Sequence, residues 1–132
     1  MTTSILARVK VRGHSGYALQ IETSSHKLTS DEPVKHGGTD TGPSPLELLL
    51  AGLGACTSIT LRMYAERKQW SLDDVDVNVR IVKEGDDQRI ERAIKISGPL
   101  DEAQRGRLLE IADKTPVTKI VAAGLPIQTS MS

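Results

Sequence analysis

The chemistry of this 132-residue chain depends first on Cys56, its only cysteine. A cysteine reacts as its thiolate, and burial among apolar side chains raises its pKa unless a cation or a helix N-terminus lowers it. Cys56 lies among Leu, Ala and Gly residues about three turns inside a predicted helix, where that helix's own dipole has little effect. A nucleophilic Cys56 would therefore need an outside cation. Without one, a lone cysteine in such surroundings is more typical of a small core residue.

The helix that carries Cys56 is the most strongly predicted element. Ser44 is a suitable N-cap and Pro45 suits the first helical position. Apolar residues recur at i, i+3, i+4 and i+7 to about Lys68, which predicts a helix roughly 36 Å long. Its uncharged stretch, 48–61, has 14 residues. Because a membrane span needs roughly 20 apolar residues, a core helix is expected and no membrane association.

Short strands and two further helices are predicted around this helix. Apolar and polar residues alternate in two hairpin regions, and local capping signals start each of the later helices. The predicted strands cover 5–12, 17–21, 26–29, 75–81, 90–96 and 127–131, and the later helices begin at Asp101 and at Thr115-Pro116. Hairpins separated by helices predict an α+β fold, with antiparallel hairpins packed around the long helix in a single domain spanning 1–132.

Composition excludes several classes of function. The 17 basic and 17 acidic residues cancel, and aromatic residues are scarce, so no nucleic-acid partner is expected. The three histidines, His14, His26 and His36, lack ligand spacing, so neither a metal nor another cofactor is expected. The first residues lack the apolar run of a signal peptide, and one cysteine cannot build a disulfide framework. A cytoplasmic, reducing location is predicted.

The cysteine helix resembles that of the OsmC/Ohr family, the osmotically inducible and organic-hydroperoxide-resistance proteins. The resemblance is carried by residues 42–57, with the sequence GPSPLELLLAGLGACT, and it continues through Leu61-Arg62-Met63-Tyr64-Ala65 into the following hairpin. Further on, Thr115-Pro116-Val117 is similar to the family's Cys-Pro-Val. The likeness covers nearly the whole chain and implies an OsmC-like fold.

A second copy of the chain is the expected partner. A helix that is apolar on every face needs more cover than one short chain supplies. The small residues Gly52, Gly54 and Ala55 reduce helix propensity, by about 1 kcal/mol for each glycine, which makes sense if another backbone packs closely there. The resemblance implies an intertwined homodimer whose two long helices cross at its centre.

The resemblance also implies peroxide reduction. In such family members a thiolate attacks the hydroperoxide oxygen and becomes a sulfenic acid, which a second cysteine resolves into a disulfide that a dithiol then reduces. Cys56 matches the attacking position. Thr115 stands at the resolving position, where it has no redox chemistry and is also a competent N-cap. The sulfenic acid would therefore have to be resolved by an external thiol.

Two further residues are candidates for activating Cys56. Family members carry a glutamate at the position of Leu46, whereas Glu47 falls roughly 180° from Cys56 around the helix. An acid in the first turn is also ordinary compensation of the helix dipole. The family's activating arginine comes from its N-terminal strand region, where Arg12 is the nearest candidate and Arg8 the other. The residues expected to line a substrate pocket are Leu46, Leu53 and Thr115.

Two functions remain open. The first is a thiol-dependent reductase of small organic hydroperoxides that acts through Cys56 and an external thiol or dithiol. The second is a non-catalytic dimer of the same fold that binds a small hydrophobic ligand at its interface. The first is the leading hypothesis, whereas the absence of a second cysteine and of the aligned glutamate favours the second. A third interpretation, a purely structural or partner-binding dimer, would need an exposed apolar patch.

Overall fold

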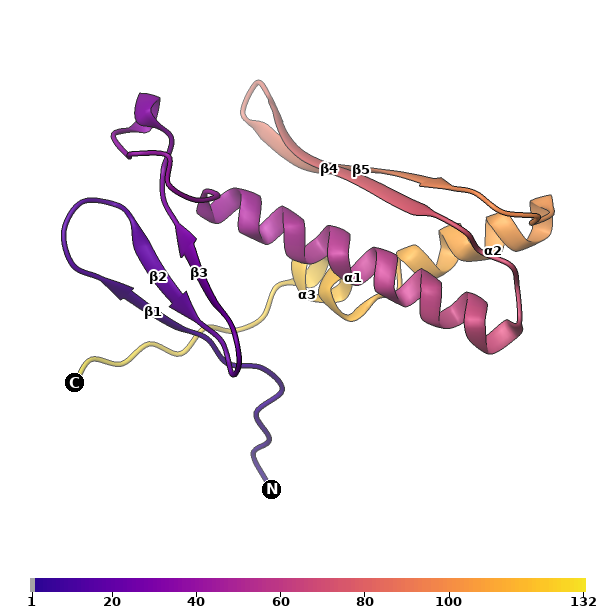
Figure 1. The fold of residues 1–132 in the computed structure, drawn as a ribbon, viewed down its shortest axis with the longest axis horizontal. Helices are drawn as coiled ribbons and strands as arrows, with labels where there is room; N and C mark the ends of the chain where they lie inside the picture. Colours follow the sequence, from indigo (N-terminus) through magenta and orange to yellow (C-terminus); the bar gives the residue numbers. More distant parts are fainter. Residues whose placement is uncertain (1) are drawn as a thin grey trace. The chain divides into compact units, whose positions relative to one another are not determined.

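The computed structural model describes residues 2–132 as an α+β chain with antiparallel strands and one long helix (Figure 1). The predicted fold class is confirmed. The chain divides into two compact units, the first ending at Leu49 and the second beginning at Leu50.

The first unit contains a three-stranded antiparallel sheet in the order β1-β2-β3. Its strands are β1 (Lys10–Gly13), β2 (Leu19–Glu22) and β3 (Lys27–Ser30). The register places Val11 opposite Ile21, and Ile21 opposite Leu28, so apolar side chains share one face of the sheet. A single 3-10 turn, η1 (Val34–His36), follows β3.

The loop after β3 is organised by Asp31, whose side chain is almost completely buried. One carboxylate oxygen accepts the backbone N–H of Glu32 at 2.7 Å. The other accepts both the N–H and the hydroxyl of Thr39, at 3.2 and 2.6 Å, and both groups of Thr41, at 3.2 and 2.8 Å. These hydroxyl groups, that of Thr39 first, hold the pKa of Asp31 well below its usual range. The carboxylate thus fixes the loop that leads into the long helix.

Replacing Asp31 by asparagine is expected to lower the melting temperature by several degrees at pH 7. One oxygen becomes an NH₂ group, which cannot accept the hydrogen bonds that Thr39 or Glu32 donates. Because the folded pKa of Asp31 is depressed, its stabilisation is present above the unfolded pKa of about 3.9 and is lost as pH falls toward the folded value. The difference in melting temperature between wild type and variant should therefore begin to shrink as the pH falls below about 4. Asp40→Asn, at an exposed position of the same loop, is the control.

The second unit is built from helices and one long hairpin. Helix α1 (Pro45–Lys68) begins in the first unit and continues into the second, as predicted. Strands β4 (Val75–Glu84) and β5 (Asp87–Ile96) pair along their whole length. They are followed by α2 (Glu102–Ala112), which starts with the predicted capping box of Asp101 and Gln104, and by α3 (Pro116–Ala123), which starts with the predicted N-cap Thr115.

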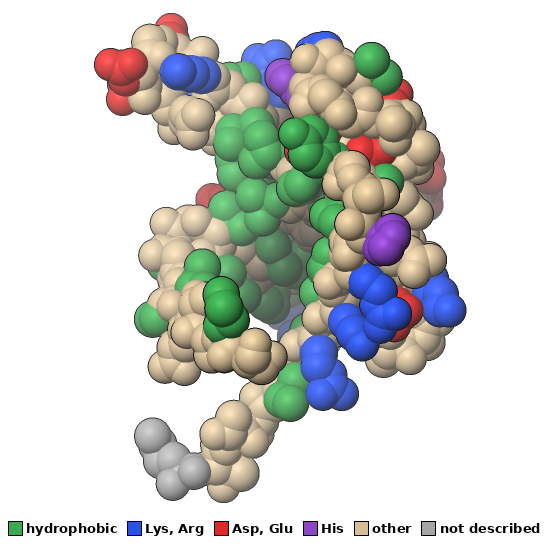
Figure 2. All heavy atoms as spheres, turned by 90° about the vertical axis from the view of Figure 1, so that its left-hand side faces the viewer, with side chains coloured by type: hydrophobic (Ala, Val, Ile, Leu, Met, Phe, Trp, Pro, Cys, Tyr) green, Lys and Arg blue, Asp and Glu red, His purple; other side chains and the backbone are tan. Residues whose placement is uncertain are grey.

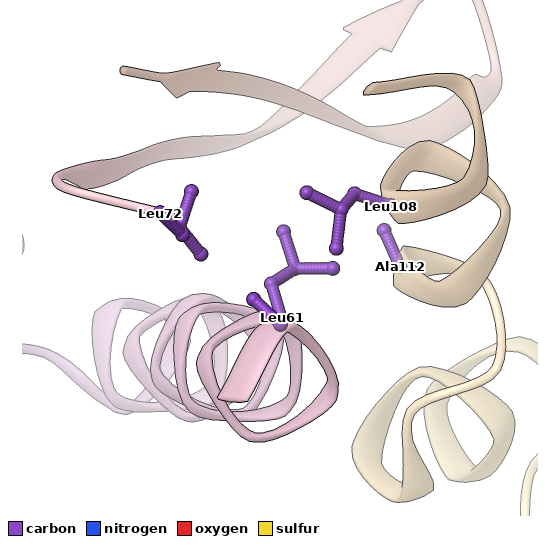
Figure 3. Packing of buried hydrophobic residues seen from close by; sticks show 5 residues of the cluster. Leu61, Leu72, Leu108 and Ala112 are labelled. Carbon is purple, nitrogen blue, oxygen red and sulfur yellow. The ribbon is translucent and has the colours of Figure 1, made fainter. Parts of the chain in front are cut away.

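The hydrophobic core of the second unit lies between α1, α2 and the chain that follows α1. Its fully buried members are aliphatic: Leu61, Ala65, Leu72, Leu108 and Ala112. Figure 3 shows the side chains of Leu61 and Leu108 directed toward each other from the two helices, with Leu72 beside them. This packing holds α1 and α2 together and so determines where the short segment after α2 leaves the core.

Helix α1 buries only one of its apolar faces within the chain. The buried residues Leu53, Thr57, Leu61 and Ala65 form a single stripe at i, i+4 spacing. Ile59 and Met63 lie on the opposite side and are 60% and 54% exposed. Hydrophobic side chains are visible at the surface in Figure 2. By length and composition alone α1 would also suit a membrane span, a property that core helices of soluble proteins share.

Two predicted strand segments are not strands. Residues 5–9 fall outside β1 because β2 ends at Glu22, opposite Lys10, and leaves them without a pairing partner. Residues 127–131, predicted as a last strand, are irregular, since neither sheet of the described chain pairs with them. Alternating side chains suit a strand, but a strand also needs a neighbour for its backbone hydrogen bonds.

Candidate functional site

Cys56 lies on α1 beside its buried stripe and is partly exposed. Its Sγ is 3.9 Å from Oγ1 of Thr60, one turn further along the same helix. Its neighbour in the sequence, Thr57, is fully buried, and its hydroxyl donates to the Leu53 carbonyl oxygen at 2.7 Å. The sulfur therefore lies at the edge of the core, where it combines partial burial with access from outside.

The N-terminus of α3 faces this sulfur. Thr115 is the N-cap of α3 and is fully buried, and Pro116 occupies the first helical position. The next residue, Val117, has a backbone N–H that has no partner within the helix, because the first N–H groups of a helix have none. This N–H and the Thr115 hydroxyl both donate toward Cys56 Sγ. The structure thus brings Thr115 and Cys56 together.

These donors change the acidity of the thiol. Partial burial raises the pKa of Cys56, but the Val117 N–H and the hydroxyls of Thr115 and Thr60 together lower it below its ordinary value. Hydrogen bonds to a thiolate favour the charged form, and a helix N-terminus adds a favourable partial charge. The second unit therefore supplies part of the activation that the sequence suggested only an outside cation could provide.

A largely buried arginine, Arg92 of β5, contacts the residues that follow Cys56 and Val117 in the sequence. Its Nη1 donates to the hydroxyl oxygens of Thr57, at 3.0 Å, and Thr118, at 2.9 Å. Its Nη2 forms an ion pair with Asp113, the C-cap of α2, at 3.0 Å. The side chain is only 13% exposed. Arg92 therefore ties β5 to α1, to α3 and to the end of α2.

The other predicted site residues lie in the first unit or line a cavity. Arg12, and the segment that holds Arg8, belong to the first unit, and both side chains are exposed. Glu47 accepts the Ser44 N–H at 2.9 Å and donates its own N–H to Ser44 Oγ at 3.2 Å, which makes it the second half of a capping box. These hydrogen bonds lower the pKa of Glu47. Leu46 is exposed, and the roles of these residues toward Cys56 stay predictions.

A cavity of about 570 Å³ lies in the second unit. More than half of its lining residues are aliphatic, and the polar ones are Gln88, Arg89 and Arg92 of β5 and Thr118 of α3. Leu53 is the predicted pocket residue that lines it, and its other main members are Ile81, Ile90, Arg92, Thr118 and Val121. Its volume falls within the range of roughly 300–1,000 Å³ that is usual for small-molecule sites.

Sequence reasoning missed Val117, Thr60, Thr118 and Arg92. The position of Arg92 could have been found, because Ile90, Ile94 and Ile96 alternate with polar residues and Arg92 falls in the same period. In β5 it stands opposite Val79 on the apolar face of the hairpin. The Val117 donor follows from a predicted helix start at Thr115-Pro116, but its aim at Cys56 depends on tertiary packing.

The arrangement offers one partly exposed thiol with a lowered pKa, surrounded by hydrogen-bond donors. Such a thiol can attack an electrophile, and the same donors can hold an oxygen attached to the sulfur. Within residues 2–132, no three His, Cys, Asp or Glu side chains are placed together to hold a metal ion.

Comparison with known families gives a match over most of the chain. The profile of the family described as OsmC-like protein matches residues 38–130, which include Cys56, α2 and α3. Among curated proteins, none matches the chain.

Several solved structures have a similar fold. An OsmC-like protein of Mycoplasma pneumoniae has a TM-score of 0.79 at 20% identity, covering 92% of this chain and 91% of its own. An organic hydroperoxide resistance protein of Legionella pneumophila has a TM-score of 0.66 at 23% identity, covering 91% and 93%. A proposed organic hydroperoxide resistance protein of Vibrio cholerae, with captopril bound in one of its active sites, has a TM-score of 0.64 at 21% identity, covering 97% and 93%. At these identities the likeness establishes the fold.

Proposed function

Because this chain belongs to the OsmC-like protein family, we propose that it reduces organic hydroperoxides through the single thiol of Cys56. The observation that supports this most directly is that the Val117 N–H and the Thr115 hydroxyl lower the pKa of Cys56. A thiolate stabilised in this way is the nucleophile that peroxide reduction needs. Hydroperoxide resistance proteins among the structural neighbours point to the same substrate class.

The first step is attack of the Cys56 thiolate on the terminal oxygen of the hydroperoxide. A sulfur–oxygen bond forms, the oxygen–oxygen bond breaks, and the alcohol leaves after it takes up a proton. Cys56 becomes a sulfenic acid, oxidised by two electrons. The donors that stabilise the thiolate, Val117 N–H and Thr115, are placed to bind the new sulfenate oxygen or the departing alkoxide.

The second step needs a thiol from outside the chain. Cys56 is the only cysteine, so an external thiol condenses with the sulfenic acid, which forms a mixed disulfide and releases water. A second external thiol, or the other half of a dithiol, attacks that disulfide and returns Cys56 to its reduced form. Partial exposure of Cys56 is consistent with access by such a reductant.

The direct test is sulfenic-acid trapping. Protein given stoichiometric cumene hydroperoxide in the presence of dimedone should gain one adduct on the Cys56 peptide, detected by mass spectrometry. Cys56→Ser should gain none, although serine preserves the size of the side chain. A folded wild-type protein whose thiol remains free after peroxide addition would contradict the proposal.

A second candidate function is binding of a small hydrophobic ligand without catalysis. The cavity of about 570 Å³ beside Leu53 supports it, because its walls are largely aliphatic. Its volume would suit a ligand of drug size. Protein that binds an apolar fluorescent probe in a manner sensitive to Leu53→Trp, and yet fails to form the sulfenic acid, would favour this candidate over the reductase.

A further inference from the structure

Arg92 is a buried cation that the proposed reaction does not yet use. It contacts Thr57 of α1, which follows Cys56 in the sequence, and Thr118 of α3, which follows Val117. We propose that Arg92 is a positioning residue for Cys56: through Thr118 and Thr115 it holds the donors of α3 against the sulfur and directs their protons toward it. The inference itself concerns the pKa of Cys56. It rests on the proposed function only in that a lowered pKa would serve attack on a hydroperoxide.

Hydrogen bonds run from Arg92 through Thr118 to Thr115, whose hydroxyl contributes to lowering the pKa of Cys56. Thr118 Oγ1 accepts from Arg92 Nη1 at 2.9 Å, so its own proton must go elsewhere. It can reach Thr115 Oγ1, at 2.7 Å, or the carbonyl oxygen of Ala112, at 3.2 Å. Thr115 Oγ1 also accepts the Thr118 N–H at 3.1 Å. When Thr118 donates to Thr115, the Thr115 proton is free to donate to Cys56 Sγ; when Thr118 donates to Ala112, the Thr115 proton makes the 2.7 Å contact with Thr118 instead.

The guanidinium group gives this chain its direction. A guanidinium can only donate, so Thr118 must accept from Arg92, and its own proton goes to Thr115 or to the Ala112 carbonyl, both of which lie away from the cation. Hydrogen-bond chains that begin at a charged donor are polarised along their length, and burial strengthens the effect. Arg92 thereby favours the arrangement in which protons point at the sulfur, which is the arrangement that stabilises a thiolate.

Few charged groups contact this series of hydrogen bonds. Arg92 of β5 and its ion-pair partner Asp113, at the end of α2, are the charged groups in contact with it, whereas α1 and α3 contribute the hydroxyls of Thr57 and Thr118. Asp113 is 80% exposed, so water and salt screen its charge more than that of the buried Arg92. Arg92 is therefore the less screened of the two charges.

The test is the pH profile of Cys56 alkylation by iodoacetamide, which requires no peroxide. In Arg92→Met the midpoint should move to higher pH, with alkylation at pH 7 slower by about threefold to tenfold, because less of the thiol is ionised. The matched control is Arg80→Met, which removes an exposed arginine from the same hairpin and breaks only a surface ion pair with Glu91. A folded Arg92→Met protein with an unchanged midpoint would overturn the proposal.

Variants of Thr118 test the same chain without removing the cation. Thr118→Val keeps the shape of the side chain but has no hydroxyl, so its midpoint should also rise, whereas Thr118→Ser should stay close to wild type. An unchanged midpoint of the alkylation profile in Thr118→Val would exclude the role of these hydrogen bonds, even if Arg92→Met does not fold. Because alkylation is measured apart from peroxide, a shifted profile in a protein that ignores cumene hydroperoxide would support the role of Arg92 while contradicting the proposed function.

Discussion

The chain is expected to be a dimer at micromolar concentration and to become monomeric when Ile59 is replaced by aspartate. Ile59 and Met63 are exposed on the side of α1 opposite its buried stripe, although the helix is apolar there as well. A partner that covers this face would enclose the new carboxylate without a counter-charge. An unpaired buried charge costs about 3 kcal/mol or more, so the dissociation constant should rise at least about a hundredfold. Light scattering over a concentration series measures it.

Two further variants test whether a second copy of the chain covers the exposed face of α1. Ile59→Val keeps the apolar surface and should remain dimeric. At Gly52 an added Cβ would meet no atom of the same chain within 4 Å, so Gly52→Leu is harmless to a single chain and raises helix propensity by roughly 1 kcal/mol. If a second helix packs against Gly52, the same substitution should instead weaken the dimer. A folded wild-type monomer would exclude the intertwined arrangement.

Local signals predicted much of the fold correctly. The long helix, the capping box at Asp101, the N-cap at Thr115 and the long hairpin follow rules that involve residues a few positions apart. The strands predicted at 5–9 and 127–131 depended on a pairing partner, which no local pattern specifies. The close approach of another backbone that was predicted at Gly52 and Gly54 is not seen within the described part of the chain. A Cβ added at Gly54 would lie 3.4 Å from the Val79 side chain of β4, which is an ordinary contact, and one added at Gly52 would meet no atom within 4 Å.

The site was harder to predict, because its residues are far apart in the sequence. Cys56 could be named from its type, and Thr115 from a resemblance, and the structure brings the two together. The donors that surround the sulfur come from the N-terminus of α3, and Arg92 comes from a strand between them in the sequence. Arg92 stands at a position where the alternation of β5 otherwise places isoleucine, and this departure from the pattern could have indicated a functional residue. Its three partners could not be inferred without the packing of β5 against the helices.

Replacing Thr115 by cysteine is expected to give a protein that closes an internal disulfide when it meets peroxide. Thr115 is fully buried and its hydroxyl faces Cys56 Sγ, so a thiol at this position would lie beside the sulfenic acid. Condensation of the two would form the sulfur–sulfur bond and release water. A disulfide needs Cα atoms about 4.4 to 6.8 Å apart, so this prediction requires that spacing between residues 56 and 115. The variant also loses the Thr115 cap, at a cost of about 1 kcal/mol, and one donor to the sulfur.

Mass spectrometry after one equivalent of an organic hydroperoxide should show the loss of two hydrogens and a cross-link between the peptides of residues 56 and 115. The external thiol then becomes unnecessary for protecting Cys56, so overoxidation to sulfinic acid should fall sharply at excess peroxide. Thr115→Ser keeps the hydroxyl and the cap but cannot form the bridge, and it should resemble wild type. A folded Thr115→Cys protein that reaches sulfinic acid without any cross-link would mean that the two side chains are not aligned for bond formation. One that does not react at all would mean that Cys56 does not attack peroxides, and ligand binding would become the better account of this chain.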